Sequence, residues 1–308
     1  MKEGYGYMEE SVQQTHRVFS LLQADPIMYS KYFATYRKNV WFRPSWLHLQ
    51  QMMRDTDGCY WIMSEGTITA GISISENALG SLFVIPPFHF SQSIAAYLKE
   101  YIIERTSGID RIHAYNVLPE HIAAFAAEGF EPVQSRKCMI RPTEDIPIQL
   151  LPRTYKCLQP SPAVRMHITR LILDSYHDHI DSRDHQCFTQ DILDYFEHHS
   201  TADLLEASSM IVDEQTEEFV GVCLVSLWEG LPLIYEIAIK PGHRGKGLAK
   251  HMLRKAIHEL NNHYYVLRLF VTTGNPAEGL YQKLGFLPGD ELTSMVCTTN
   301  PMSKSEGV

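Results

Sequence analysis

The sequence lacks several features that would assign it to common classes of protein. Its 27 Lys and Arg residues are outnumbered by 36 Asp and Glu residues, and the net charge of −9 argues against a protein that coats nucleic acid. No apolar run approaches the roughly 18 residues of a membrane span, and the start has no apolar segment of a secretory signal. The six cysteines include no Cys-x-x-Cys pair, which predicts reduced thiols in a cytoplasmic protein rather than a disulfide framework or a zinc ribbon.

The chain does contain enough apolar material for about two domains. Its 308 residues are 44% hydrophobic, with 16 Tyr, 13 Phe and 4 Trp, which argues against disorder. Prolines gather between Arg141 and Pro162, and their density favours an extended connector over a helix or an inner strand. We therefore expect a first domain at 1–141, a linker at 142–161 and a second domain at 162–308.

The second half alternates helical and strand patterns. Apolar spacing predicts helices at 163–179, 190–198, 248–260 and 277–284. Apolar runs predict strands at 210–212, 219–227, 233–239, 265–271 and 293–298.

The first half repeats this plan. Strands are expected at 60–64, 67–75, 82–85 and 112–115, and helices at 94–103 and 121–128. Gly129-Phe130 precedes Gly285-Phe286 by 156 residues, and two further pairs share that offset: Pro132 with Pro288 and Met139 with Met295. We predict an internal duplication.

One segment suggests chemistry. The strand that ends at Ile239 is followed by a Pro-Gly turn, then by Gly245 and Gly247, and then by a helix. Helix N-terminal amides lack partners and glycines let a phosphate approach them, so this pattern predicts a cradle for an anion. Five cations and no carboxylate occur between Pro241 and His258. A polyphosphate ligand suits that charge; the alternative is a glycine turn before a helix with a solvated basic face.

These residues resemble a known family. The run His243, Arg244, Gly245, Lys246, Gly247, Leu248, Ala249 is similar to the acetyl-CoA pyrophosphate loop of the GCN5-related N-acetyltransferases (GNAT). A second similarity follows about thirty residues later, in Asn275-Pro276-Ala277, Leu280-Tyr281 and Leu284-Gly285-Phe286. The resemblance covers about 164–297 and, more weakly, most of the first half. It implies an α+β fold of two tandem GNAT domains, each with a mixed central sheet flanked by helices.

The resemblance also implies a donor and its site. Acetyl-CoA, or a short acyl-CoA, is expected in a gap between the strands at 233–239 and 265–271. Its pantetheine arm is expected to pair with the backbone of Ile237, Ala238 and Ile239, and its pyrophosphate to bind the loop from His243 to Ala249. One backbone N–H near Ala238 or Ile239 is expected to polarise the thioester carbonyl.

Three side chains are expected to serve this reaction, each with a structural alternative. Tyr281 matches the family tyrosine that protonates the leaving thiolate, or it simply fills the groove. Glu236 is the candidate base for the acceptor ammonium, unless strand alternation turns it toward solvent or a salt bridge. Asn275 is expected to contact the pantetheine arm, to cap the following helix, or both.

The first half departs from the family pattern. Its segment from Phe83 to Gln92 has no glycine and carries two prolines, and Phe125 stands at the position equivalent to Tyr281. Only Asn116 hints at the second signature. We expect a degenerate copy that does not bind the cofactor productively and that shapes the acceptor groove or a dimer contact.

Two other groups of residues have more than one possible role. The polar set His177, Asp178, His179, Asp181, Asp184, His185, Cys187 is read as acceptor contacts or a solvated loop in preference to a metal site. The aromatic set Tyr29, Tyr32, Phe33, Tyr36, Trp41, Phe42, Trp46 is expected in the core rather than in a ligand cage.

The sequence thus predicts a cytoplasmic N-acetyltransferase, monomeric or homodimeric, that needs no metal and binds neither nucleic acid nor membrane. Its acceptor is a primary amine on a small molecule or a peptide, and the acidic balance of the chain would suit a cationic one. The alternative is a non-catalytic acyl-CoA-binding sensor or scaffold.

Overall fold

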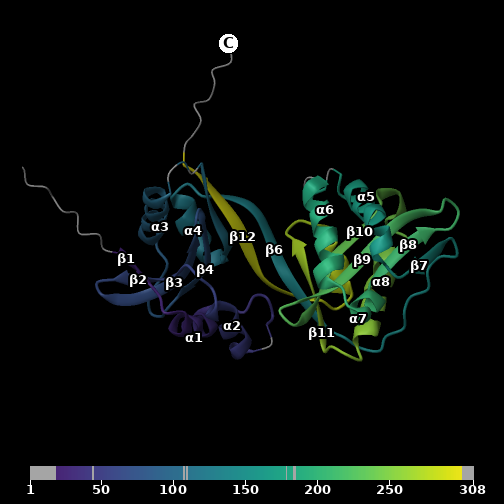
Figure 1. The fold of residues 1–308 in the computed structure, drawn as a ribbon, viewed down its shortest axis with the longest axis horizontal. Coiled ribbons are helices and arrows are strands. Elements are labelled where there is room, and N and C mark those ends of the chain that lie inside the picture. The colour runs from purple at the N-terminus through teal and green to yellow at the C-terminus, as the bar shows by residue number, and fades with distance from the viewer. Residues whose placement is uncertain are drawn as a thin grey trace, which may run out of the picture.

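The structure is a computed structural model that describes residues 19–299 except 44, 107, 109, 178, 183 and 184 (Figure 1). The start of the chain, where no secretory segment was expected, lies outside this range. The strands are β1 (Phe19–Gln23), β2 (Cys59–Ser64), β3 (Thr67–Ser75), β4 (Ala78–Val84), β5 (Arg111–Val117), β6 (Glu131–Pro142), β7 (Tyr155–Leu158), β8 (Ser209–Asp213), β9 (Glu218–Trp228), β10 (Leu231–Ile239), β11 (Val266–Thr272) and β12 (Leu287–Thr298). The helices are α1 (Pro26–Tyr36), α2 (Trp46–Arg54), α3 (Gln92–Arg105), α4 (Pro119–Ala127), α5 (Arg165–Tyr176), α6 (His185–Asp194), α7 (Ala202–Ala207), α8 (Leu248–Leu260) and α9 (Glu278–Lys283).

The two halves repeat the same elements at a displacement of 156 residues. β6 and β12 match at both ends, since Glu131 corresponds to Leu287 and Pro142 to Thr298. α3 and α8 begin at the same displacement, at Gln92 and Leu248. The predicted α+β tandem arrangement is therefore confirmed at the level of individual elements.

The strands of both halves join in one mixed sheet of twelve strands, in the order β1-β2-β3-β4-β5-β12-β6-β11-β10-β9-β8-β7. The last strand of each half is exchanged: β6 pairs with β11 of the second half, and β12 pairs with β5 of the first half. β6 and β12 also pair with each other, and Figure 1 shows them running side by side between the halves. This exchange was not predicted, because a local apolar pattern does not specify which strand will be its neighbour.

Each exchanged strand contributes to the core of the opposite half. Met139 of β6 is fully buried among residues of α8, β9 and β11, in the second half. Met295 of β12 is buried against α3 and β5, in the first half. The two methionines that share the offset of 156 residues thus hold equivalent places in opposite cores.

The helix α8 carries the candidate phosphate loop at its N-terminus and is fixed firmly on the sheet. Its apolar face, which includes Met252, Ala256 and Ile257, is completely buried against the sheet. The connector from 142 onward runs along its other side, where Arg254 Nε donates to the carbonyl of Pro147 at 2.8 Å and His251 contacts the carbonyl of Gln149. This connector has no helix before residue 162, and its β7 lies at the edge of the sheet.

The aromatic set near the N-terminus enters the core only in part. Tyr29, Phe33 and Trp41 are buried, as expected. Tyr36 and Trp46 are exposed, so the core assignment is wrong for these two. Among the helices described, none combines the length and the apolar character needed to cross a membrane.

Candidate active site

A cavity of about 1010 Å³ opens where the parallel strands β10 and β11 separate. Only Leu233 and Arg268 pair across these two strands, although β10 continues to Ile239. On its other edge, β10 pairs with β9, and the register of this pairing shifts between Ile234 and Glu236, close to the point where β10 leaves β11. The strands therefore diverge beyond Leu233, as the family resemblance implied for this pair.

Backbone alternation decides which groups of β10 face the gap. Lys240 donates its N–H to Val220 of β9 at 2.9 Å, and the antiparallel ladder then turns the backbone groups of Ala238 toward β9 as well. The N–H and C=O groups of Ile237 and Ile239 point into the gap. An acyl-CoA arm could pair with these two residues, and the amide of Ile239 is the group available to polarise a carbonyl.

The loop before α8 has the conformation that the glycines suggested. Gly245 and Gly247 adopt φ values of +76° and +83°, and Gly247 is the residue from which α8 begins, with no side chain capping the helix. A Cβ on Gly245 would meet nothing within 4 Å, so the backbone there is open to a ligand. The amides of the first turn of α8 lack partners within the helix, and Leu248, Ala249 and Lys250 line the cavity.

Arg244 ties this loop to two neighbouring elements. Its Nε donates to the carbonyl of Ile239 at 3.1 Å, and its Nη2 donates to the carbonyl of Ser175 near the end of α5 at 2.7 Å. The loop is thereby held at the mouth of the gap, before any ligand binds.

His243 and Lys246 are expected cofactor ligands whose side chains do not line the cavity. His243 Nδ1 lies 3.0 Å from the hydroxyl of Tyr155 in β7, and Lys246 Nζ donates to the same hydroxyl at 3.0 Å. These two side chains brace the loop from its outer side. Their predicted part in cofactor binding remains a prediction and would have to use their backbone groups.

Tyr281 lies on α9 and lines the cavity with only 6% of its surface exposed. Burial raises the pKa of its phenol well above the usual 10, with smaller contributions from the charges of Cys223 and Glu236. The hydroxyl therefore keeps its proton at neutral pH. Burial and protonation agree both with an acid that protonates a leaving group and with a side chain that fills the groove.

Glu236 also lines the cavity, where it joins a tyrosine that the sequence did not single out. Glu236 Oε1 accepts from the N–H of Ile237 at 3.0 Å and from the hydroxyl of Tyr176 at 2.6 Å. The same hydroxyl lies 2.9 Å from the carbonyl of Ile237. Burial, followed by the charge of Glu236, raises the pKa of Tyr176 well above its usual value. Tyr176 was missed because it ends the apolar stripe of α5, where a tyrosine is ordinary.

Asn275 makes the expected helix-capping contact. Its Oδ1 accepts from the N–H of Ala277 at 2.8 Å, at the start of α9. Its Nδ2 donates to Asp181 Oδ2 at 2.8 Å, and Thr272 Oγ1 donates to Asp181 Oδ1 at 2.5 Å. Asn275 lines the cavity, and the contact with pantetheine remains a prediction.

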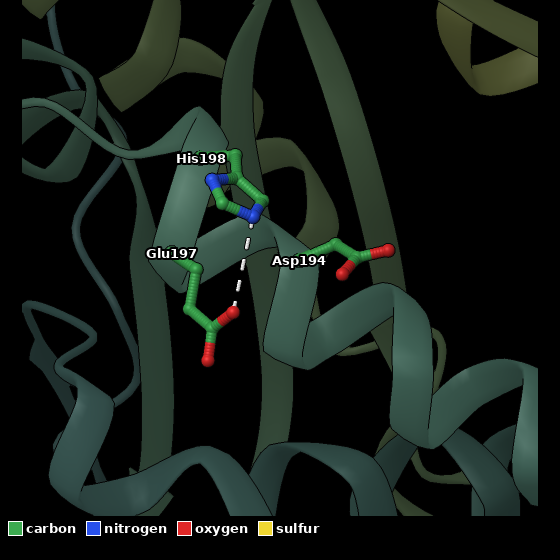
Figure 2. A group of neighbouring side chains, drawn as sticks. All are labelled: Asp194, Glu197 and His198. Carbon is green, nitrogen blue, oxygen red and sulfur yellow. Dashed lines mark ion pairs between the residues drawn. The ribbon is translucent and has the colours of Figure 1, made fainter.

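The polar set after α5 is divided by the structure. His179 and Asp181 line the cavity, whereas His177 and His185 line a separate hollow and Cys187 is exposed. Asp178 and Asp184 lie outside the described residues. Among the residues described, the group whose ligand atoms come close enough to hold a metal is a different one, Asp194, Glu197 and His198, at the end of α6 and in the following π-helical turn Tyr195–His199 (Figure 2). Glu197 and His198 in this group are exposed, which is common for acidic groups without an ion.

The equivalent gap in the first half is closed. Between β4 and β5 the structure leaves a cavity of only about 10 Å³. Arg37 enters this gap and donates to the carbonyls of Leu82 at 3.0 Å and of Asn116 at 2.9 Å. Phe125 is buried between Phe90 and Phe130 where the second half has Tyr281. Arg37 therefore fills the gap between β4 and β5, and Phe125 offers no hydroxyl at the position of Tyr281.

The chain is similar to known acetyltransferases in sequence and in fold. The model of the acetyltransferase (GNAT) family matches residues 170–286. A GCN5-related N-acetyltransferase from Sphaerobacter thermophilus has a TM-score of 0.68 at 15% identity, covering 93% of this chain and 97% of its own. A tandem GNAT protein from the clavulanic acid biosynthesis pathway has a TM-score of 0.58 at 14% identity, covering 92% and 99%.

A GNAT-family acetyltransferase from Colwellia psychrerythraea has a TM-score of 0.52 at 11% identity, covering 91% and 99%. None of the curated proteins matches the sequence significantly. At these identities the solved structures establish the fold, and the family model identifies the half that carries the open cavity. Residues 170–286 are a domain of the acetyltransferase (GNAT) family, and the described chain as a whole has the tandem GNAT fold.

Proposed function

We propose that the second half transfers an acetyl or other short acyl group from its CoA thioester to a primary amine, by direct attack in a ternary complex. The family supports an acyl-CoA-dependent acyltransferase. The observation that carries the proposal is the open cavity of about 1010 Å³ between β10 and β11, which ends at the glycine loop and contains Tyr281. The first half is a poor alternative location for this reaction, because its equivalent gap is closed.

The residues present suit a CoA thioester. The edge of β10 at Ile237 and Ile239 faces the gap and offers the N–H of Ile239 to an amide-bearing arm, while Arg244 holds the carbonyl of Ile239. The amides of α8 can hold a diphosphate. When bound, acetyl-CoA supplies an activated acyl group on a thiol leaving group. Glu236 and Tyr176 engage the backbone of Ile237 in this structure, so pairing there requires these side chains to yield.

The proton transfers are assigned to two side chains. Glu236, directly or through a water, accepts a proton from the acceptor ammonium, which leaves a neutral amine able to attack. The amide of Ile239 stabilises the negative charge on the carbonyl oxygen. Tyr281, which its raised pKa keeps protonated at neutral pH, donates its proton to the departing sulfur and then takes up the second proton that the acylated nitrogen loses. The amine nitrogen gains the acyl bond as the carbon–sulfur bond breaks.

Substitution of Tyr281 tests this assignment. We expect Tyr281→Phe to lower kcat by roughly 10²- to 10⁴-fold, the contribution typical of a positioned acid, with little change in CoA affinity. Thiol release from acetyl-CoA with a panel of amines measures the rate, and calorimetry measures affinity. Tyr29→Phe is a matched control, because Tyr29 is a fully buried tyrosine of the first half.

Two results would contradict the proposal. If Tyr281→Phe retains the wild-type rate, the tyrosine only fills the groove. If the wild-type protein binds CoA but no amine raises thiol release above hydrolysis, a sensor or scaffold is the better reading. A cytoplasmic location is part of the proposal and is supported by the six free cysteines.

A further inference from the structure

The expected linker at 142–161 contains a tyrosine that reaches the glycine loop before α8. Tyr155 is the first residue of β7, where it pairs with Asp213 of β8 near the edge of the sheet. It has 9% of its surface exposed and belongs to the same core as Leu248 and Met252 of α8. A residue of the linker is therefore packed against the helix whose first turn faces the cavity between β10 and β11.

The hydroxyl of Tyr155 joins two residues of this loop. Lys246 Nζ donates to the hydroxyl at 3.0 Å, and His243 Nδ1 lies 3.0 Å from the same oxygen. The rings of Tyr155 and His243 meet edge to face, with centroids 5.8 Å apart at 83°, and Lys246 Nζ lies 5.7 Å from the centre of the Tyr155 ring. A phenol can accept from an ammonium while it donates its own proton to an imidazole nitrogen, so one hydroxyl can bond both neighbours.

The two residues that Tyr155 bonds lie on either side of Arg244 and Gly245. Gly245 has a φ of +76°, and among the described residues an added Cβ there would meet nothing within 4 Å. Because glycine has more conformational freedom than any other residue, a turn at Gly245 keeps its form only if its neighbours restrain it. Arg244 supplies that restraint on the side of β10 and α5. His243 and Lys246, bonded to Tyr155, supply it on the side of β7.

The carboxylate of Asp213 lies near this group but does not replace the hydroxyl. Asp213 Oδ2 is 3.9 Å from His243 Nδ1, which is beyond hydrogen-bond distance, and Asp213 Oδ1 accepts from the N–H of Gln215 at 3.0 Å. The contact between His243 Nδ1 and the Tyr155 hydroxyl is shorter by 0.9 Å, from 3.9 Å to 3.0 Å. Removal of the hydroxyl therefore takes away a hydrogen bond that the carboxylate does not supply in this structure.

We propose that Tyr155 is a positioning residue for the diphosphate of the CoA thioester. Its hydroxyl holds His243 and Lys246, and through them the turn at Gly245, in the form that receives the ligand. Tyr155 acts from behind the loop, outside the lining of the larger cavity. A loop that is ordered in advance loses less conformational entropy when the ligand binds, so the hydroxyl raises the affinity for CoA without touching it. The inference rests on the CoA site of the proposed function, and it makes the linker part of that site.

Tyr155→Phe tests the inference, because it removes the hydroxyl and keeps the buried ring. Calorimetry on the full chain measures the affinity for CoA, and competition against CoA measures the affinity for pantetheine, which lacks the diphosphate. We expect Tyr155→Phe to weaken CoA binding roughly 5- to 30-fold, the effect of one lost hydrogen bond to a charged partner. Pantetheine should bind Tyr155→Phe as it binds the wild type. Tyr264→Phe is the matched control, since Tyr264 packs against the same core but donates to Asp203 Oδ2 of α7 at 2.9 Å.

Two further measurements follow the proposed route through the loop. Hydrogen exchange of the protein without ligand should be faster at 243–249 in Tyr155→Phe than in the wild type, and unchanged there in Tyr264→Phe. In a double-mutant cycle, Tyr155→Phe should weaken CoA binding less when Lys246 is already replaced by Met, because the bond from Lys246 is then absent. Circular dichroism establishes that each variant is folded.

The outcomes separate the inference from the proposed function. The inference is overturned if Tyr155→Phe binds CoA like the wild type, if it weakens pantetheine as much as CoA, if Tyr264→Phe weakens CoA equally, or if exchange at 243–249 is unchanged. If amines are acylated and Tyr155→Phe leaves the KM for acetyl-CoA unchanged, acyl transfer stands and the inference fails. If Tyr155→Phe selectively weakens CoA binding although no amine is acylated by the wild type, the proposed function fails and the inference stands.

Discussion

Arg37 closes in the first half the gap that stays open in the second. Its guanidinium joins the backbones of β4 and β5 by bonding the carbonyls of Leu82 and Asn116, and burial lowers its pKa to about 10. At neutral pH the side chain remains charged, so a buried cation occupies the place where a cofactor arm would otherwise pair. A single side chain therefore fills much of the gap between β4 and β5 in this copy.

The reactivity of individual cysteines can also be predicted. Burial raises the pKa of Cys59 to about 11 and those of Cys138 and Cys223 to about 12, whereas Cys187 is exposed. Because the thiolate is the reactive form, a thiol reagent at pH 8 should modify Cys187 rapidly and these three only on unfolding. Mass spectrometry of the modified sites measures this, and Cys187→Ser should remove the fastest phase. Rapid labelling of Cys223 in the folded protein would contradict it.

The same thiols predict how stability depends on pH. Their folded pKa values lie above the ordinary value of about 9, so folding favours the neutral thiol. The stability they contribute is fully present below pH 9 and is lost progressively as pH rises toward 12. Urea unfolding at pH 8 and at pH 10 should show a lower free energy of unfolding at pH 10. Cys223→Ala should reduce that difference, and an unchanged difference would assign it to other groups.

At the scale of elements, the turn into α8 can be tested through Gly245. An added Cβ at φ +76° strains the backbone by about 1 kcal/mol and occupies the face that a diphosphate would approach. We expect Gly245→Ala to weaken CoA binding about tenfold or more while the fold is retained. Gly245→Val should have a larger effect.

Gly66→Ala is the control for this substitution. Gly66 has φ +79° and equally open surroundings, but it lies in the turn between β2 and β3 of the first half. The Gly66→Ala variant should lose about as much stability as Gly245→Ala and should keep its CoA affinity. If both variants bind CoA like the wild type, the phosphate loop has been placed wrongly.

The bounds of elements such as α8 could be predicted closely because they depend on residues that are near one another in the sequence. The expected bounds 248–260 are those observed, and the two glycines before them adopt the positive φ values that glycine permits. The strand expected at 293–298 begins instead at Leu287, since β12 passes Pro288 and Gly289 through a register shift. The role of Tyr176 could not be predicted, because its contact with Glu236 depends on how α5 packs over β10.

At the scale of the whole molecule, the exchanged strands should make the two halves unfold together. Each half takes a buried methionine from the other, Met139 in one direction and Met295 in the other. Replacing either with Ala creates a cavity that typically costs about 2–5 kcal/mol. We expect Met139→Ala and Met295→Ala to shift one common transition by similar amounts.

Urea unfolding can report on both halves. Trp61 is buried in the first half and Trp228 lies in the second, so single-tryptophan variants give separate signals. Met166→Ala is a suitable control because Met166 is exposed. Two separate transitions, each sensitive to only one methionine, would show that the halves are independent. The linker at 142–161 remains a prediction. This measurement tests whether the two domains that it separates in the sequence also unfold independently.

The pairing of β12 with β5 has a consequence for how the protein matures. During synthesis the ribosome makes β5 long before β12, and the whole second GNAT domain lies between them in the sequence. The sheet of the first half therefore cannot be completed while the nascent chain is still at β10 or β11, and its open edge needs shielding in the meantime. We expect folding to occur late in translation, and chaperone association to persist until β12 has emerged.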